Sequence, residues 1–142
     1  MNHKQVELVQ ASWKKVLAHS DTVAQLFYTR LFTLDPSLRP MFKGEMTEQG
    51  RKLVAMISVA VNGLARIETL VPVIEALGRR HAGYGVRDRH YLTVAEALLW
   101  TLEQGLGTAF TAETKQAWIE AYGLLATTMQ NGAKAEEPAK AA

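Results

Sequence analysis

The sequence predicts an all-α protein of six main helices plus a short helical turn. Apolar residues recur every three to four positions in successive segments, and no alternating apolar and polar run is long enough to compete as a strand. The chain has 142 residues, enough for one domain, and its helix lengths do not suit a four-helix bundle. We expect this domain to occupy residues 1–132. Residues 133–142 are expected to form a disordered tail.

The composition narrows the function classes. Hydrophobic residues make up 48% and charged residues 21%, as in an ordinary soluble protein with a packed core. Sixteen basic residues nearly balance 14 acidic ones, so a nucleic-acid partner gains little support. Cysteine is absent, which excludes disulfides, thiolate metal sites, iron–sulfur clusters and thioether-linked haem. Any metal ion must therefore be held by histidine or carboxylate side chains.

Membrane insertion and export are not expected. The longest stretches without charge, residues 53–65 and 121–133, hold 13 residues each. Spanning a bilayer takes roughly 18 to 20 apolar residues. The first seven residues contain no apolar signal core. We therefore expect a cytoplasmic protein with no membrane partner.

Capping and breaking residues divide the chain into its helices. Ser20-Asp21 separates the first two, and Asp35-Pro36 marks the start of the short turn, because proline is well tolerated at the first helical position. Later helices are expected to start at Thr47, Asp88 and Thr111. The glycines that are expected to stop helices are Gly83, Gly85, Gly105 and Gly107, with Asn131-Gly132 ending the last helix.

Histidine 81 is the first candidate for chemistry. His81 continues the apolar stripe of Ile74 and Leu77, so its side chain should point inward. The common explanation is a histidine at the core edge, hydrogen-bonded to a carbonyl. The alternative is an axial ligand of haem iron, since a single imidazole in an apolar pocket commonly holds b-type haem. No two of the four histidines have the spacing of a zinc pair.

Three further residues have both a structural and a functional explanation. Gln49 precedes Leu53 by one helical turn, so it is either a surface residue or a hydrogen-bond donor aimed into a pocket. Tyr28 is either a packing residue or a donor, and Phe42 would by default anchor its loop. The chain has no glycine-rich phosphate loop, nucleophile elbow or convincing Ser/His/Asp set. Hydrolase and kinase functions are therefore disfavoured.

Several segments together resemble one family. The segment LFYTRLF at residues 26–32, then Pro36 and the PMF of residues 40–42, resemble the second helix and following corner of bacterial haemoglobins and the haem domains of flavohaemoglobins. Gln49 with Leu53 matches their distal pair, and LGRRHAGYGV at residues 77–86 is similar to their proximal helix. The resemblance covers roughly residues 4 to 130 and implies the globin fold around one haem.

The resemblance also implies a role for each matching residue. It makes His81 the proximal ligand of a non-covalent haem b, with Phe42 stacked on the porphyrin. Tyr28 and Gln49 become distal hydrogen-bond donors to a bound gas, and Leu53 closes the pocket. The further pocket-lining residues that it implies are Val86, Tyr91, Val94 and Tyr122.

The sequence departs from the family pattern in two places. We do not expect the flavin and nicotinamide reductase modules of flavohaemoglobins here, because 142 residues are enough for only one domain. Where some members carry a glutamate that supports the proximal histidine, this chain has Ala133. Strong electron donation by His81, which would favour O–O cleavage, therefore gains no support.

Three functions follow as hypotheses. The first is reversible, high-affinity dioxygen binding for storage or delivery, with nitric oxide and carbon monoxide as further ligands and a monomer or homodimer as the assembly. The second is nitric oxide dioxygenase activity, which converts nitric oxide to nitrate with a separate reductase. The third is a helical interaction module without haem, which would follow if the resemblance were accidental.

Overall fold

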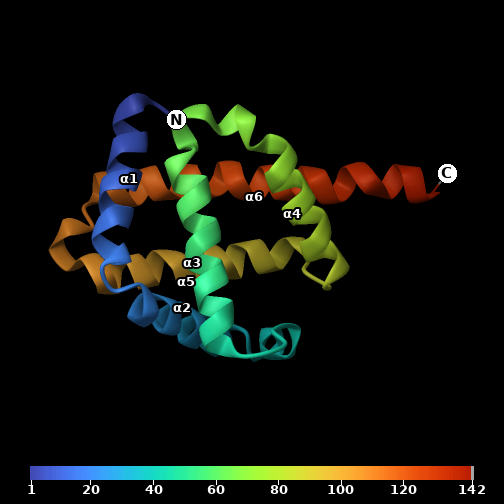
Figure 1. Ribbon diagram of the computed structural model, residues 1–142, viewed down its shortest axis with the longest axis horizontal. Coiled ribbons are helices and arrows are strands. Elements are labelled where there is room, and N and C mark those ends of the chain that lie inside the picture. The colour runs from blue at the N-terminus through green and yellow to red at the C-terminus, as the bar shows by residue number, and fades with distance from the viewer. Residues whose placement is uncertain (142) are drawn as a thin grey trace.

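The computed structural model describes the backbone of residues 1–141 and the side chains of residues 1–134, and it confirms the predicted all-α class. The described residues contain six α-helices and three 3-10 helices (Figure 1). In chain order these are α1 (His3–Leu17), α2 (Ser20–Leu34), η1 (Pro36–Met41), α3 (Met46–Asn62), η2 (Leu64–Thr69), α4 (Val71–Gly83), α5 (Asp88–Leu106), η3 (Gly107–Ala109) and α6 (Ala112–Ala141). Only η1 was predicted among the short helices; η2 and η3 are additional.

The helices pack as crossing pairs. The most extensive contacts join α4 to α6 and α2 to α5, and α1 and α3 complete the core against α6 and α2. In Figure 1, α5 and α6 run across the view, while α3 and α4 cross it from top to bottom. Within residues 1–141, no helix has the length and apolar run that a membrane crossing would need.

Several of the predicted helix signals act where they were expected, but Thr47 and Asp88 are not caps, because α3 follows Glu45 and α5 follows Arg87. Gly105 lies within α5 and does not stop it. The Asp35 carboxylate accepts a hydrogen bond from the Ser37 N–H at 3.1 Å and so caps η1, with Pro36 at its start. The Thr111 hydroxyl oxygen accepts from the Thr114 N–H at 3.1 Å at the start of α6. Gly107 ends α5 with a φ of 56°, in the region that favours glycine.

The predicted end of the last helix at Asn131-Gly132 is wrong, because α6 continues through both residues to Ala141. Gly132 is buried, and a Cβ atom there would collide with the backbone of Glu75 on α4. This glycine therefore allows a close helix crossing and does not stop the helix. The expected disorder of residues 133–142 falls mostly on residues 135–142, whose side chains lie outside the described part, and stays a prediction.

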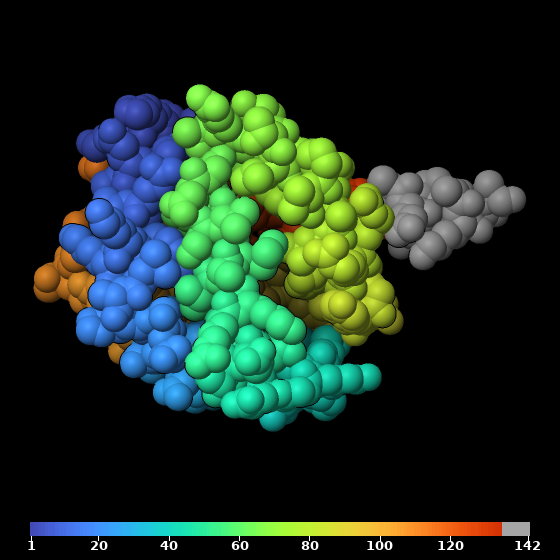
Figure 2. Space-filling view, in the orientation of Figure 1, coloured from blue at the N-terminus to red at the C-terminus, as the bar shows by residue number. Residues whose placement is uncertain are grey.

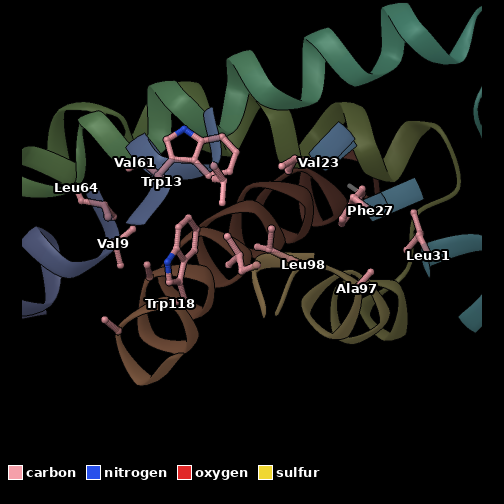
Figure 3. Packing of buried hydrophobic residues seen from close by; sticks show 14 of the residues in the cluster. Val9, Trp13, Val23, Phe27, Leu31, Val61, Leu64, Ala97, Leu98 and Trp118 are labelled. Atoms are coloured by element: carbon pink, nitrogen blue, oxygen red, sulfur yellow. The ribbon is translucent and has the colours of Figure 1, made fainter. Parts of the chain in front are cut away.

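Two tryptophans organise the core between α1, α3 and α6. The Trp13 and Trp118 rings meet edge to face, with centroids 5.9 Å apart. Their indole N–H groups donate to serine hydroxyls, Trp13 to Ser58 at 2.9 Å and Trp118 to Ser12 at 2.8 Å. Figure 3 shows both indoles among the apolar side chains of this cluster. The two tryptophans therefore contribute both apolar packing and hydrogen bonds to the core.

Substituting the glycines of the α4–α6 crossing tests its role. A Cβ at Gly78 would collide with the Met129 backbone, so Gly78→Ala should destabilise the fold by about 2–3 kcal/mol. Gly123→Ala on exposed α6 is the matched control, because a Cβ there meets nothing within 4 Å. It should stabilise the protein by about 0.5–1 kcal/mol. Urea unfolding measures both, and equal stability of the two variants would contradict the close crossing.

Candidate functional site

The main predicted site residues come from α2, α3 and α4. Figure 2 shows a hollow between α3 and α4, with atoms of α6 visible at its floor. Gln49 and Leu53 lie on α3, and His81 lies on α4. Tyr28 comes from α2, whose contacts include α3. Of these residues, Tyr28 and Gln49 are in direct contact across two helices.

His81 is held in one tautomer by its own helix. It lies in the last turn of α4, where its Nδ1 atom is 2.8 Å from the Leu77 carbonyl oxygen. A carbonyl only accepts, so Nδ1 must carry the proton and Nε2 keeps its lone pair. Burial lowers the pKa of His81 below its usual value, and the Leu77 carbonyl opposes this shift. The imidazole is therefore neutral near pH 7, as a metal ligand must be.

Tyr28 lies within an aromatic cluster. Its side chain is buried, with 8% exposed, and its ring meets Phe42 edge to face at a centroid distance of 5.3 Å. Phe27 packs edge to face against it and Phe32 stacks on it, at 5.2 and 5.9 Å. Burial raises the pKa of Tyr28 to about 12. The phenol therefore keeps its proton and acts as a donor throughout the neutral range.

Tyr28 and Gln49 meet, but through the backbone of Gln49. The Tyr28 hydroxyl donates to the Gln49 carbonyl oxygen at 3.2 Å. The Gln49 amide instead donates from Nε2 to the Lys43 carbonyl at 2.8 Å, which ties it to the loop before α3. The structure therefore brings Tyr28, Phe42 and Gln49 together, while the Gln49 amide is engaged with that loop.

Leu53 on α3 packs against the hydrophobic core. It is half-buried and borders a void of about 10 Å³ with apolar walls. The other residues around this void are Trp13, Val23, Ala24, Phe27, Val54, Ile57, Leu98, Thr101 and Leu102. The void is too small to hold a molecule larger than water, so the core behind Leu53 is closely packed.

The remaining predicted lining residues lie on α5, on α6 and in the turn between α4 and α5. The Tyr122 hydroxyl on α6 donates to the Tyr91 carbonyl at 2.6 Å, and burial raises the pKa of both phenols. Tyr122 also borders an apolar groove of about 260 Å³ between α5 and α6. Val94 is half-buried against the core, and the Val86 N–H donates to the His81 carbonyl at 3.0 Å. The last contact ties the α4–α5 turn to the His81 backbone.

Two features of the site were not predicted from the sequence. Phe32, which stacks on Tyr28, follows it by four residues on the same helix, so helical spacing could have found it. The Lys43 carbonyl that accepts the Gln49 amide is a backbone atom and leaves no signal in the sequence.

The side chains that could ligate a metal are compatible with a haem that is held by one protein ligand. Among the described side chains, no group of three or more His, Asp or Glu residues is placed to hold a metal ion. Haem needs a single protein ligand, and a neutral imidazole such as that of His81 is chemically suited to be one. The aromatic and apolar surroundings of Tyr28 and Leu53 suit a porphyrin, which is itself largely apolar.

The structure is an all-helical protein with a neutral imidazole on α4 and a buried phenol on α2. Residues 25–129 match the family model of the globins. Neuroglobins from Tetraodon nigroviridis and Danio rerio are each 30% identical over 146 residues, which covers 93% of this chain and 92% of each relative. The chain belongs to the globin family, whose members generally bind haem and oxygen.

Solved structures agree with this assignment. An engineered carbene transferase, described as a putative nitric oxide dioxygenase from Rhodothermus marinus, superposes with a TM-score of 0.87 and 26% identity. The match covers 100% of this chain and 99% of that one. A bacterial globin from Campylobacter jejuni gives a TM-score of 0.85 at 23% identity, over 96% of this chain and 99% of that one, and supports the fold alone.

The protonation state of Tyr28 can be tested directly. Its pKa of about 12 means that it should remain a phenol at pH 10, where an ordinary tyrosine is half ionised. In the ferrous protein, the wild type and Tyr28→Phe should therefore give the same phenolate absorbance at pH 10. A deficit of half a phenolate in Tyr28→Phe would show that Tyr28 titrates normally and is not buried.

Proposed function

We propose that this globin holds a non-covalent haem b and binds dioxygen reversibly with high affinity. The observation that carries the proposal is the neutral His81, whose Nε2 lone pair is free, together with the buried, protonated Tyr28. His81 would ligate the iron, and the haem would supply the metal centre at which a diatomic gas binds. The absence of cysteine means that no thioether link is available.

The lining residues have separate roles in this proposal. Phe42, at the mouth of the Tyr28 cluster, would stack on the porphyrin. Leu53 would restrict the space above the metal, while Val86, Tyr91, Val94 and Tyr122 would line the rest of the pocket. Their largely apolar surfaces exclude water and lower the local dielectric, which strengthens any hydrogen bond made inside.

Tyr28 would be the main donor to dioxygen. Its hydroxyl is 3.2 Å from the Gln49 carbonyl, a long and ordinary neutral hydrogen bond. Such a bond contributes about 0.5–1.5 kcal/mol, against about 1.5–3 kcal/mol for a bond to a charged partner. Dioxygen in the pocket is partly negative, so the phenol gains by turning from the carbonyl to the gas. Carbon monoxide carries little negative charge and should gain much less.

Gln49 would be the second donor. To reach the gas, its amide must leave the Lys43 carbonyl, to which it donates at 2.8 Å. This hydrogen bond is exposed, so water can replace it at little cost. We therefore expect Gln49 to contribute less than Tyr28.

Removing the phenol hydroxyl tests the role of Tyr28. Tyr28→Phe should release dioxygen roughly ten- to a hundredfold faster, the equivalent of a hydrogen bond of about 1.5–3 kcal/mol. Stopped-flow displacement of dioxygen by carbon monoxide measures this rate. Tyr84→Phe is the control, because the Tyr84 side chain is 67% exposed at the end of α4 and should not alter the rate. An unchanged release rate in Tyr28→Phe would remove Tyr28 from this role.

Nitric oxide dioxygenase activity is the second candidate. It is favoured by the likeness to the Rhodothermus marinus protein, which is described as a putative nitric oxide dioxygenase. A bound haem would supply the site at which dioxygen and nitric oxide combine to nitrate, together with one electron that a separate reductase would return. Tight binding of dioxygen suits both functions, so the pocket alone does not distinguish them.

Mixing the oxygenated protein with nitric oxide separates the two functions. A dioxygenase should form one nitrate per haem within the mixing time and should continue to turn over with NADH and a cell extract. An oxygen carrier should not sustain turnover under these conditions. Buffer with free haem controls for reaction outside the protein.

A further inference from the structure

Positive charge is concentrated at the corner between α4 and α5. Residues 79–92, here called the arginine corner, contain Arg79, Arg80, Arg87 and Arg89 with Asp88 as their only acidic residue. Their net charge of +3 exceeds the +2 of the whole chain, so the remaining residues are slightly acidic together. The charges that nearly cancel over the whole sequence are therefore unevenly distributed along it.

These arginines face water. Arg80, Arg87 and Arg89 are exposed and Arg79 is half-buried. None of the ion pairs found among the described side chains involves them. Asp88 has a different partner, since its carboxylate accepts from the Gln130 amide at 3.3 Å. No ion pair among the described side chains therefore neutralises these arginines. The pKa of the Asp35 carboxyl is lowered mainly by the Ser37 hydrogen bond and only weakly by Arg89.

The arginine corner also presents apolar side chains to solvent. Leu92 is 71% exposed and Tyr84 is 67% exposed, the highest values among the large hydrophobic residues of the described part. Leu92 follows Arg89 by three residues on α5, so the two share a face of that helix. The Tyr84 ring lies 6.4 Å from the His81 ring between centroids. This apolar surface is thus adjacent to the proposed iron ligand.

The backbone holds the arginine corner in a fixed shape. Gly85 has a φ of 94°, which lets the chain turn sharply after α4. The Tyr84 N–H donates to the His81 carbonyl at 3.0 Å, and the Arg87 N–H donates to Nδ1 of buried His90 at 2.8 Å. A surface whose backbone is already ordered loses less entropy when a partner binds.

We propose that the arginine corner docks an acidic electron-carrying protein that reduces the iron held by His81. The inference rests on the proposed haem function. One electron would pass from the reduced flavin of the donor to ferric iron, so that the flavin is oxidised, the iron becomes ferrous and no bond is formed. Charge complementarity selects an acidic face on the partner, and Tyr84 and Leu92 provide the apolar contact.

A protein partner suits this surface better than an anionic membrane. Protein interfaces are enriched in arginine and tyrosine and depleted of lysine. The arginine corner contains four arginines and no lysine, whereas lipid headgroups attract both residues alike. A segment of 14 residues is also of a size that suits the small interfaces of transient redox complexes, which bury less than about 1,200 Å².

Charge reversal tests the proposal with the haem-loaded chain and an acidic flavodoxin as the probe. Arg87→Glu with Arg89→Glu should weaken binding by at least about tenfold at low ionic strength, measured by isothermal titration calorimetry. Lys14→Glu with Lys15→Glu, on the exposed face of α1, makes the same change in net charge away from the arginine corner. It should have a much smaller effect. Binding should weaken as salt is added.

A second readout follows electron transfer. The rate at which flavodoxin hydroquinone reduces the ferric protein should fall in the corner variant and remain in the α1 variant, with the visible spectrum unchanged in both. Tyr84→Ala should weaken binding without altering its dependence on salt, which would separate the apolar contact from the charges.

Three results would overturn the proposal. The first is the absence of flavodoxin binding to the wild type. The second is an equal loss of flavodoxin affinity in the two charge-reversed variants. The third is binding to phosphatidylserine vesicles that requires Arg87 and Arg89, while binding to flavodoxin does not require them. The last result would assign the arginine corner to a membrane. Intact flavodoxin binding by a protein that fails to bind dioxygen would contradict the proposed gas binding alone.

Discussion

The hydrogen bond from His81 to the Leu77 carbonyl is the interaction on which the site depends. It fixes the proton on Nδ1 and leaves the Nε2 lone pair available, and burial keeps the imidazole neutral. The hydrogen bond is made within the last turn of α4, and burial of the ring is a separate effect. Without them, the same histidine would be an ordinary side chain at the edge of the core. A neutral carbonyl also donates less electron density to the imidazole than a carboxylate would, which is consistent with Ala133 in place of a glutamate.

The position of α4 depends in turn on its crossing with α6. Gly78 and Gly132 remove the side chains that would separate the two helices, so α4 lies close against α6 while its other side borders the hollow. The tryptophan pair packs between α1, α3 and α6, where serine hydroxyls accept from both indoles. The hollow is therefore bounded by helices that are fixed elsewhere in the fold.

Helix class and helix starts could be predicted because their signals are local. Apolar spacing predicted the α-helices, and Asp35 and Thr111 act as the caps that their types indicate. Gly132 was misread because a glycine that stops a helix and one that permits a close crossing look the same in sequence. The stripe alone left His81 undecided, and the family resemblance supplied its role. The direction of the Gln49 amide depends on a backbone carbonyl, which no side-chain pattern encodes.

Adding haem to the purified wild type and to His81→Ala, with and without free imidazole, tests the account most directly. The visible spectrum should show a histidine-ligated haem in the wild type and lose that signature in His81→Ala. Free imidazole should restore it by entering the space that the side chain leaves. A His81→Ala protein that keeps the wild-type ferrous and carbon monoxide spectra without imidazole would contradict the assignment of the proximal ligand.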